Sequence, residues 1–207
     1  MDTRKKLYPS LFNPLLLKTT RPLPKEVAVI GAGTIGPDIG YYLKTALPGI
    51  KLYLVDVAEE PLKSAEKRLS GYAKKAVSRG KMKEDQAKAV LENISFTMDY
   101  DQIKNCELVI EAATENISLK QRIFETVEGI VSEDAIITSN TSSIPADRIF
   151  SGMKKPERTT ITHFFAPAWR SLPVEVIAWE RGSQEVVDYL TWFFVNTGKA
   201  PIITDPD

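Results

Sequence analysis

A short apolar run that leads into regularly spaced glycines constrains the fold of this chain more than any other feature. Residues 27–30 (Val-Ala-Val-Ile) are long enough to cross a sheet as a buried strand and too short for a helix. The turn that follows has the pattern Gly-x-Gly-x-x-Gly and contains Gly31, Gly33, Thr34, Ile35 and Gly36. A strand, a tight glycine turn and a helix N-terminus together cradle a pyrophosphate, so this segment predicts a dinucleotide-binding fold.

A second predicted strand ends in an acid at the distance that such folds use to hold a ribose. Lys51 to Asp56 reads Lys-Leu-Tyr-Leu-Val-Asp, and Asp56 lies 25 residues after Gly31. A carboxylate there hydrogen-bonds the ribose hydroxyls and repels a 2′-phosphate, which favours NAD over NADP. Asp56 could instead cap the loop or the next helix. The joint occurrence of strand, glycine turn, helix, strand and acid favours the cofactor role.

Strands and helices alternate along the rest of the chain. The pattern predicts helices over 35–45, 60–79, 83–93, 118–131 and 183–196, and strands over 94–97, 107–112, 135–139, 159–162, 173–178 and 200–204. Ser118 with Gln121 predicts a capping box at one helix start. The alternation indicates one α/β domain over residues 25–207, with a doubly wound, mostly parallel sheet. An extended helical pair follows its second strand.

The composition is that of an ordinary globular domain and argues against several functions. Of 207 residues, 43% are apolar and 26% charged, which allows a sizeable core. Basic and acidic residues balance at 27 each, so charge gives no case for nucleic acid or an anionic membrane, and no apolar run approaches membrane-spanning length. The single histidine, His163, excludes a multi-histidine metal site. The single cysteine, Cys106, cannot form an internal disulfide, which fits a cytoplasmic location.

Residues 1–24 are predicted to form an extension that precedes the domain. Basic residues at 4–6 and apolar residues at 11–17 resemble a secretory signal, but Pro14 interrupts the apolar run and no small-residue cleavage site follows. We therefore expect Leu11, Phe12 and residues 15–17 to pack on the surface of the domain. Pro22 and Pro24 then form a stiff lead into the first strand.

Three further stretches carry candidate functional side chains. The helical pair is rich in lysine and arginine, which is typical of a solvated helix face or of an arm that contacts a phosphate-bearing substrate; charge alone favours the solvated face. Asn140-Thr141-Ser142-Ser143 follows a predicted strand, where ligands bind in such sheets, although polar loops also supply helix caps. Glu175 lies inside an apolar run, where a buried carboxylate needs a partner.

Together these motifs resemble the NAD-binding domain of the L-3-hydroxyacyl-CoA dehydrogenases, a Rossmann fold. The resemblance covers about residues 25–205. It rests on residues 27–36, Asp56, residues 111–116 (Glu-Ala-Ala-Thr-Glu-Asn) with Lys120, residues 139–143 (Ser-Asn-Thr-Ser-Ser), and His163-Phe164-Phe165 through Glu175. The Ser-Asn-Thr-Ser-Ser and His-Phe-Phe blocks, in order and properly spaced, are far more specific than the glycine turn.

The resemblance implies NAD-dependent oxidation of an L-3-hydroxyacyl-CoA to a 3-ketoacyl-CoA, as in fatty-acid β-oxidation. It implies that His163 is the general base, that Glu175 orients it, and that Ser142 touches both cofactor and substrate oxygen. The implied cofactor contacts are Gly31, Gly33, Thr34, Ile35, Gly36, Asp56, Glu115, Lys120 and Asn140, the last three at the nicotinamide half. The lysine-rich helical pair matches an arm around the CoA moiety, which favours substrate contact over a merely solvated face.

Two features depart from the family pattern. Ala166 replaces the asparagine of His-Phe-Phe-Asn-Pro, and Trp169 and Arg170 are bulkier and more basic than usual, which predicts altered substrate preference or weaker activity. The family pattern continues after Asp205 into a helical domain that supplies much of a homodimer interface and covers the acyl chain. We therefore expect this chain to be an excised cofactor domain that binds NADH but turns over 3-ketoacyl-CoA slowly. A homodimer is implied for the full-length family member and left open for this chain.

Two other functions stay open at this point. The chain could belong to a dehydrogenase of a hydroxy acid that carries no CoA, although the lysine-rich arm favours CoA. It could also be a non-catalytic NAD-binding module. His163 and Glu175 argue against a module, because pure binding needs no base.

Overall fold

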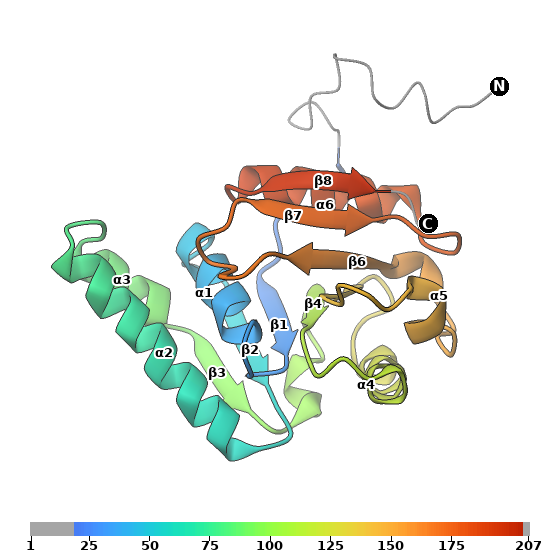
Figure 1. The fold of residues 1–207 in the computed structure, drawn as a ribbon, viewed down its shortest axis with the longest axis horizontal. Helices are drawn as coiled ribbons and strands as arrows, with labels where there is room; N and C mark the ends of the chain where they lie inside the picture. The colour runs from blue at the N-terminus through green and yellow to red at the C-terminus, as the bar shows by residue number, and fades with distance from the viewer. Residues whose placement is uncertain (1–18, 205–207) are drawn as a thin grey trace, which may run out of the picture.

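The computed structural model describes residues 19–204, which form one mixed sheet with helices on both faces (Figure 1). The strands of this range are β1 (Glu26–Ile30), β2 (Lys51–Val55), β3 (Ile94–Thr97), β4 (Leu108–Glu111), β5 (Ile136–Ser139), β6 (Thr159–Phe164), β7 (Pro173–Ile177) and β8 (Ala200–Thr204). Its α-helices are α1 (Gly36–Ala46), α2 (Glu59–Ser78), α3 (Glu84–Leu91), α4 (Ile117–Ile130), α5 (Ala146–Ile149) and α6 (Gln184–Asn196). The expected packing of residues 11–17 and the family pattern after Asp205 lie outside the described residues.

The strand order confirms the predicted doubly wound, mostly parallel fold. Within residues 19–204 the order is β3-β2-β1-β4-β5-β6-β7-β8, and β3 to β6 run parallel. This order reverses beside β1, which is the switch point where such sheets bind dinucleotides. β7 pairs antiparallel with β6, and β8 runs parallel to β7. The alternation of elements did not indicate this reversal. It occurs because only residues 165–172 connect β6 to β7, too few for a parallel crossover.

Both faces of the sheet are buried, and alternate residues of one strand serve opposite cores. Val27 and Val29 of β1 pack in the core that includes residues of α1, α2 and α6. Ala28 and Ile30 pack in the other core, with Phe124 of α4. Burial on both faces explains why β1 is a continuous apolar run rather than an alternating one. No helix in the range 19–204 is both long and apolar enough to cross a membrane.

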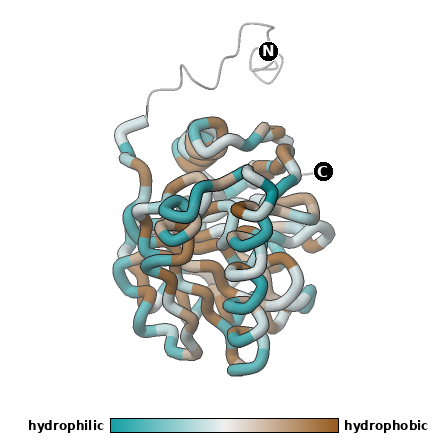
Figure 2. Tube along the Cα trace, turned by 90° about the vertical axis from the view of Figure 1, so that its left-hand side faces the viewer, coloured by the Kyte–Doolittle hydropathy of each residue, from teal (hydrophilic) through white to brown (hydrophobic). Residues whose placement is uncertain are grey.

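The predicted helical pair is confirmed as α2 and α3, which stand at the edge of the fold beside β3 (Figure 1). Gly80 separates the two helices with a φ of +66°, in the left-handed region that favours glycine. In Figure 2, which looks from the side of α2, the helix facing the viewer is largely hydrophilic on its outer turns. The apolar face of α2 is buried through Leu62, Ala65 and Leu69.

The predicted capping box of Ser118 with Gln121 is wrong. α4 begins at Ile117, and its cap is Asn116, whose side-chain oxygen accepts a hydrogen bond from the Leu119 amide at 2.9 Å. The Gln121 side chain instead donates to the Arg148 carbonyl oxygen at 2.8 Å. Asparagine caps a helix as well as serine does, and it occurs two residues earlier, so the helix starts there.

Candidate functional site

The glycine turn closes tightly on itself, and its three glycines are needed for two different reasons. Gly31 has a φ of +105°, and a Cβ there would lie 2.5 Å from the Ala112 carbonyl oxygen. A Cβ on Gly36 would lie 1.8 Å from the Gly31 carbonyl oxygen. A Cβ on Gly33 would meet no atom within 4 Å. The first and third glycines therefore let the backbone fold, whereas the second leaves space for a group that approaches from outside.

The start of α1 and the end of β2 suit the two polar parts of a dinucleotide. The N-cap residue Ile35 provides no side-chain cap, so the first amide groups of α1 are left for an anion. Asp56 accepts hydrogen bonds from the amides of Ala32 at 2.8 Å and Ala58 at 3.2 Å. Asp56 thus caps the turn and also faces the cleft described next, so its two interpretations are compatible.

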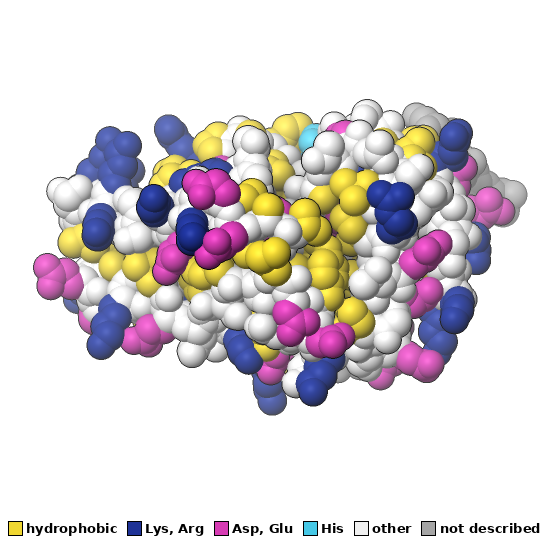
Figure 3. Space-filling view, turned by 90° about the horizontal axis from the view of Figure 1, so that it is seen from below, with side chains coloured by type: hydrophobic (Ala, Val, Ile, Leu, Met, Phe, Trp, Pro, Cys, Tyr) yellow, Lys and Arg dark blue, Asp and Glu magenta, His cyan; other side chains and the backbone are white. Residues whose placement is uncertain are grey.

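One cleft of about 720 Å³ brings most of the predicted site residues together. The predicted residues that line it are Gly31, Gly33, Thr34, Ile35, Asp56, Glu115, Lys120, Asn140, Ser142 and His163. Gly36 and Glu175 lie behind this lining, against Gly31 and His163 respectively. Seen from below, hydrophobic side chains gather over the middle of the molecule and charged ones surround them (Figure 3).

His163 forms a hydrogen-bonded pair with Glu175 beside this cleft. The two residues are register partners across β6 and β7, and Nδ1 of His163 lies 2.7 Å from Oε2 of Glu175. Their side chains are 20% and 30% exposed. A carboxylate only accepts hydrogen bonds, so in the neutral imidazole this contact favours the tautomer with its proton on Nδ1 and its lone pair on Nε2. The pair can therefore accept a proton at Nε2.

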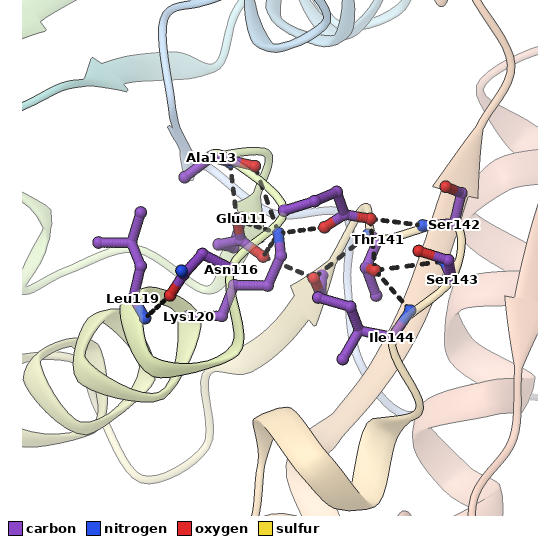
Figure 4. Close-up of polar contacts among 11 residues, drawn as sticks. Glu111, Ala113, Asn116, Leu119, Lys120, Thr141, Ser142, Ser143 and Ile144 are labelled. Carbon is purple, nitrogen blue, oxygen red and sulfur yellow. Dashed lines mark hydrogen bonds and ion pairs between the residues drawn. The ribbon is translucent and has the colours of Figure 1, made fainter.

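A buried ion pair, which sequence reasoning missed, lies beneath the same cleft (Figure 4). Glu111 at the end of β4 and Lys120 of α4 have side chains that are 0% and 1% exposed, and Nζ lies 2.7 and 2.9 Å from the two carboxylate oxygens. Glu111 also accepts hydrogen bonds from the Ser139 hydroxyl at 2.5 Å and the Ala113 amide at 2.7 Å. An acid that ends an apolar strand was the available signal, because such a group needs a partner.

Glu115 extends this network to the loop that carries Ser142. Its Oε2 lies 3.1 Å from Nζ of Lys120, and its Oε1 accepts from the Thr141 hydroxyl at 2.6 Å and the Ser142 amide at 3.1 Å. Burial raises the pKa of Glu115, but the Thr141 hydroxyl and the Lys120 ammonium outweigh burial and leave the pKa lowered. Glu115 is thus held as a carboxylate between two loops.

Asn140 ties the β5 loop to the strand of His163. Its side-chain oxygen accepts a hydrogen bond from the Phe164 amide at 2.8 Å. This contact uses the acceptor of the side chain and leaves its N–H groups as donors beside the cleft. Phe165 also lines the cleft, and the centroid of its ring lies 4.8 Å from the centroid of the His163 imidazole.

The strand order, the glycine turn and the acid after β2 define a Rossmann-type dinucleotide-binding domain. The family model for the NAD-binding domain of 3-hydroxyacyl-CoA dehydrogenase matches residues 26–207. The chain therefore belongs to this family, and its cofactor is NAD.

The similarity extends to curated relatives and to solved structures. The chain is 33% identical over 181 residues to the fatty acid oxidation complex subunit alpha of Idiomarina loihiensis, covering 87% of this chain and 25% of the relative. The crystal structure of 3-hydroxybutyryl-CoA dehydrogenase from Escherichia coli K12 matches with 30% identity and a TM-score of 0.86, over 89% of this chain and 39% of that one. The (S)-3-hydroxybutyryl-CoA dehydrogenase of Ralstonia eutropha matches with 29% identity and a TM-score of 0.84, over 89% and 64%. The chain spans about a quarter of the length of the curated relatives it matches.

Proposed function

We propose that this chain is the NAD-binding and proton-transfer part of a dehydrogenase that oxidises L-3-hydroxyacyl-CoA to 3-ketoacyl-CoA. The observation that carries the proposal is the hydrogen-bonded pair of His163 and Glu175, which lies on the same cleft as the glycine turn and Asp56. A domain that only binds a dinucleotide needs no oriented base on that cleft. Family membership and the 3-hydroxybutyryl-CoA dehydrogenases among the structural relatives support the substrate class.

In this proposal His163 takes the hydroxyl proton of the substrate on Nε2. An imidazole can accept and release a proton near neutral pH, and the Glu175 carboxylate orients the ring and stabilises the imidazolium that forms. When bound, NAD supplies the hydride acceptor. The Ser142 hydroxyl would contact the substrate oxygen, since Ser142 lines the cleft and its amide is fixed by Glu115.

The remaining predicted residues are assigned to the two ends of NAD. Gly31, Gly33 and Gly36 shape the pyrophosphate turn, together with Thr34 and Ile35. Asp56 would hold the adenosine ribose. The groups assigned to the nicotinamide half are Glu115, Lys120 and Asn140, which the buried network and the Phe164 amide fix in place. Lys120 would act there chiefly through Glu115, because its ammonium group is engaged within the network.

A second candidate is a dehydrogenase of a hydroxy acid without CoA. It is favoured by Ala166, which lines the cleft where the family pattern has an asparagine. The alanine side chain offers the cleft no hydrogen-bonding group at this position. The lysine-rich face of α2 favours CoA, because a phosphate-bearing substrate would find several cations there.

A binding and turnover panel tests the proposal and separates it from the second candidate. NADH is titrated by fluorescence, and the reduction of acetoacetyl-CoA is compared with that of free acetoacetate. We expect NADH to bind and NADPH to bind much more weakly, and we expect slow reduction of acetoacetyl-CoA. Equal or faster reduction of acetoacetate would support the second candidate. NADH binding without reduction of either compound would identify a non-catalytic module.

We also propose a domain division and a location. Residues 25–207 would form the NAD-binding domain and residues 1–24 an extension of it, with homodimerisation a property of a full-length family member. A cytoplasmic location is supported by Cys106, which is buried and not in a disulfide. Burial raises the pKa of its thiol, so the group is kept in its neutral form.

A further inference from the structure

Arg68 is the basic residue of α2 that reaches back to the glycine turn. Its Nη1 donates to the Gly33 carbonyl oxygen at 2.9 Å, and its Nη2 donates to the Thr34 carbonyl oxygen at 2.9 Å. The neighbouring Lys67 is exposed. The basic run of α2 therefore contains at least one side chain that serves the turn rather than the outer face of the helix.

The two carbonyl contacts fix the direction of two amide groups. In a trans peptide, the carbonyl of one residue and the N–H of the next point in opposite directions. Within residues 19–204 the cis bond is Ala166–Pro167, so the peptides after Gly33 and Thr34 are trans. When Arg68 holds both carbonyls, the amides of Thr34 and Ile35 point away from it. Thr34 and Ile35 line the cofactor cleft.

Arg68 is itself held by two residues outside the turn. Its Nη2 lies 2.7 Å from Oδ1 of Asp38, a residue of α1 whose side chain is 7% exposed. The Tyr72 hydroxyl donates to the same Asp38 oxygen at 2.9 Å. The ring of Tyr72 packs against Tyr41 and Trp169, with centroids 5.2 and 5.3 Å away. The guanidinium group is thus fixed in one place, and it does not depend on a ligand for its counter-charge.

We propose that Arg68 is a positioning residue for the cofactor pyrophosphate. It holds the Gly33 and Thr34 carbonyls so that the amides of Thr34 and Ile35 are aimed at the anion before the cofactor arrives. Asp38 and Tyr72 hold Arg68 in turn. This inference concerns the binding of NAD and does not depend on which substrate the enzyme uses.

The test measures how tightly three variants of this chain bind each of two ligands. Arg68→Met removes the charge and both donors, Arg68→Lys keeps a charge but loses the planar fork, and Lys67→Met is the matched control that removes an exposed charge one residue away. NADH, which contains the pyrophosphate, is compared with adenosine, which lacks it. We expect Arg68→Met to weaken NADH binding about tenfold or more, with Arg68→Lys in between. Adenosine binding by all variants and NADH binding by Lys67→Met should stay within about twofold of wild type.

Amide hydrogen exchange without any ligand gives an independent readout. Arg68→Met should speed exchange at the Ile39 amide, which donates to the Ile35 carbonyl oxygen at 3.0 Å and so reports on the end of the turn, while Lys67→Met should leave it unchanged. Should Arg68→Met fail to fold because Asp38 is left unpaired, the Arg68→Lys variant decides. Equal loss of NADH and adenosine binding would overturn the proposal, since it would show a general structural role. NADH affinity within twofold of wild type in a folded Arg68 variant would overturn it as well.

Discussion

His163 and Glu175 face each other across the one antiparallel pair in the described sheet, and their side chains meet at 2.7 Å. Residues directly opposite in such a pair are close enough for their side chains to interact. The reversal of β7 therefore brings a carboxylate to the only histidine of the chain. It fixes that histidine beside the cleft that also contains Ser142 and Asn140.

Removing the imidazole should abolish proton transfer and spare cofactor binding. In His163→Ala we expect the rate of acetoacetyl-CoA reduction to fall by at least about 100-fold, because the imidazolium gives its proton to the substrate oxygen in this direction and general acid–base catalysis contributes that much or more. Glu175→Gln should lower the rate less, since the base is kept but its orientation is weakened. Steady-state rates and NADH titrations measure both effects. Parallel loss of NADH affinity in His163→Ala would instead indicate a structural histidine.

Substitution by alanine should destabilise the fold at Gly36 but not at Gly33, although both glycines belong to one turn. Gly36→Ala places a Cβ 1.8 Å from the Gly31 carbonyl oxygen, so we expect a loss of at least about 2 kcal/mol in the free energy of unfolding. Gly33→Ala meets no atom within 4 Å and should keep its stability within about 0.5 kcal/mol. It should nevertheless weaken NADH binding, because the methyl group occupies the approach of the pyrophosphate. Urea unfolding and NADH titration of both variants check the contrast, and a stable Gly36→Ala protein would refute it.

The Glu111–Lys120 pair should contribute far more to stability than an exposed pair does. Glu111→Gln leaves the ammonium of Lys120, 1% exposed, without its main partner, so we expect a loss of about 3–5 kcal/mol. The double variant Glu111→Gln/Lys120→Met should recover part of this loss. Glu59→Gln is the control, because it breaks a pair whose side chains are 56% and 70% exposed and should cost under about 1 kcal/mol. Urea unfolding of the three proteins measures these changes in the free energy of unfolding. Similar losses of stability in Glu111→Gln and Glu59→Gln would contradict the prediction.

Lys199 should make stability rise with pH in the alkaline range. Its ammonium donates to the Ala168 and Ser171 carbonyls and lies 4.3 Å from the ring centroid of Tyr42. Burial lowers its pKa to about 8, below the ordinary 10.5 of the unfolded chain. Between about pH 8 and 10 the unfolded state therefore binds more protons, and stability increases with pH.

The variant Lys199→Met lacks this group, so the difference in unfolding free energy should shift in favour of wild type as pH rises through that window. Urea unfolding at several pH values measures the difference. Lys88→Met serves as the control, because that side chain is 80% exposed. A difference that stays flat with pH for Lys199→Met would rule out the titration.

Features that depend on neighbouring residues in the sequence could be predicted well. The strand at 27–30, the glycine turn and the acid at position 56 form one continuous pattern, and the structure places their atoms together. The element boundaries were predicted within two residues for β1, α1 and α2, where proline, glycine and apolar periodicity coincide. These signals are local because backbone preferences and the spacing of apolar residues in a strand or helix are set by a few neighbouring residues.

Features that depend on contacts between distant segments could not be predicted from the residues alone. The direction of β7 depends on the length of the loop before it. The burial of the Glu111 carboxylate depends on its ion pair with Lys120 in the next helix. Arg68 belongs to a run of basic residues whose charge alone predicts a solvated helix face. Its guanidinium nevertheless contacts the glycine turn at Gly33, 35 residues earlier. The family resemblance supplied the interpretation of His163 and Glu175; the antiparallel register supplied their contact.

The connection between β6 and β7 has a consequence for how such a domain can diversify. His163 and Glu175 are register partners on the paired strands themselves, and neither stands on the connecting residues 165–172. The loop also carries the partly exposed side chains of Phe165 and Trp169. Under the proposed function, substitutions in this loop would therefore change the wall of the cleft and leave His163 and Glu175 in register. If the proposed function holds, substrate range and acid–base chemistry are separable in this architecture, and substitutions in the loop are the place to begin changing the first without damaging the second.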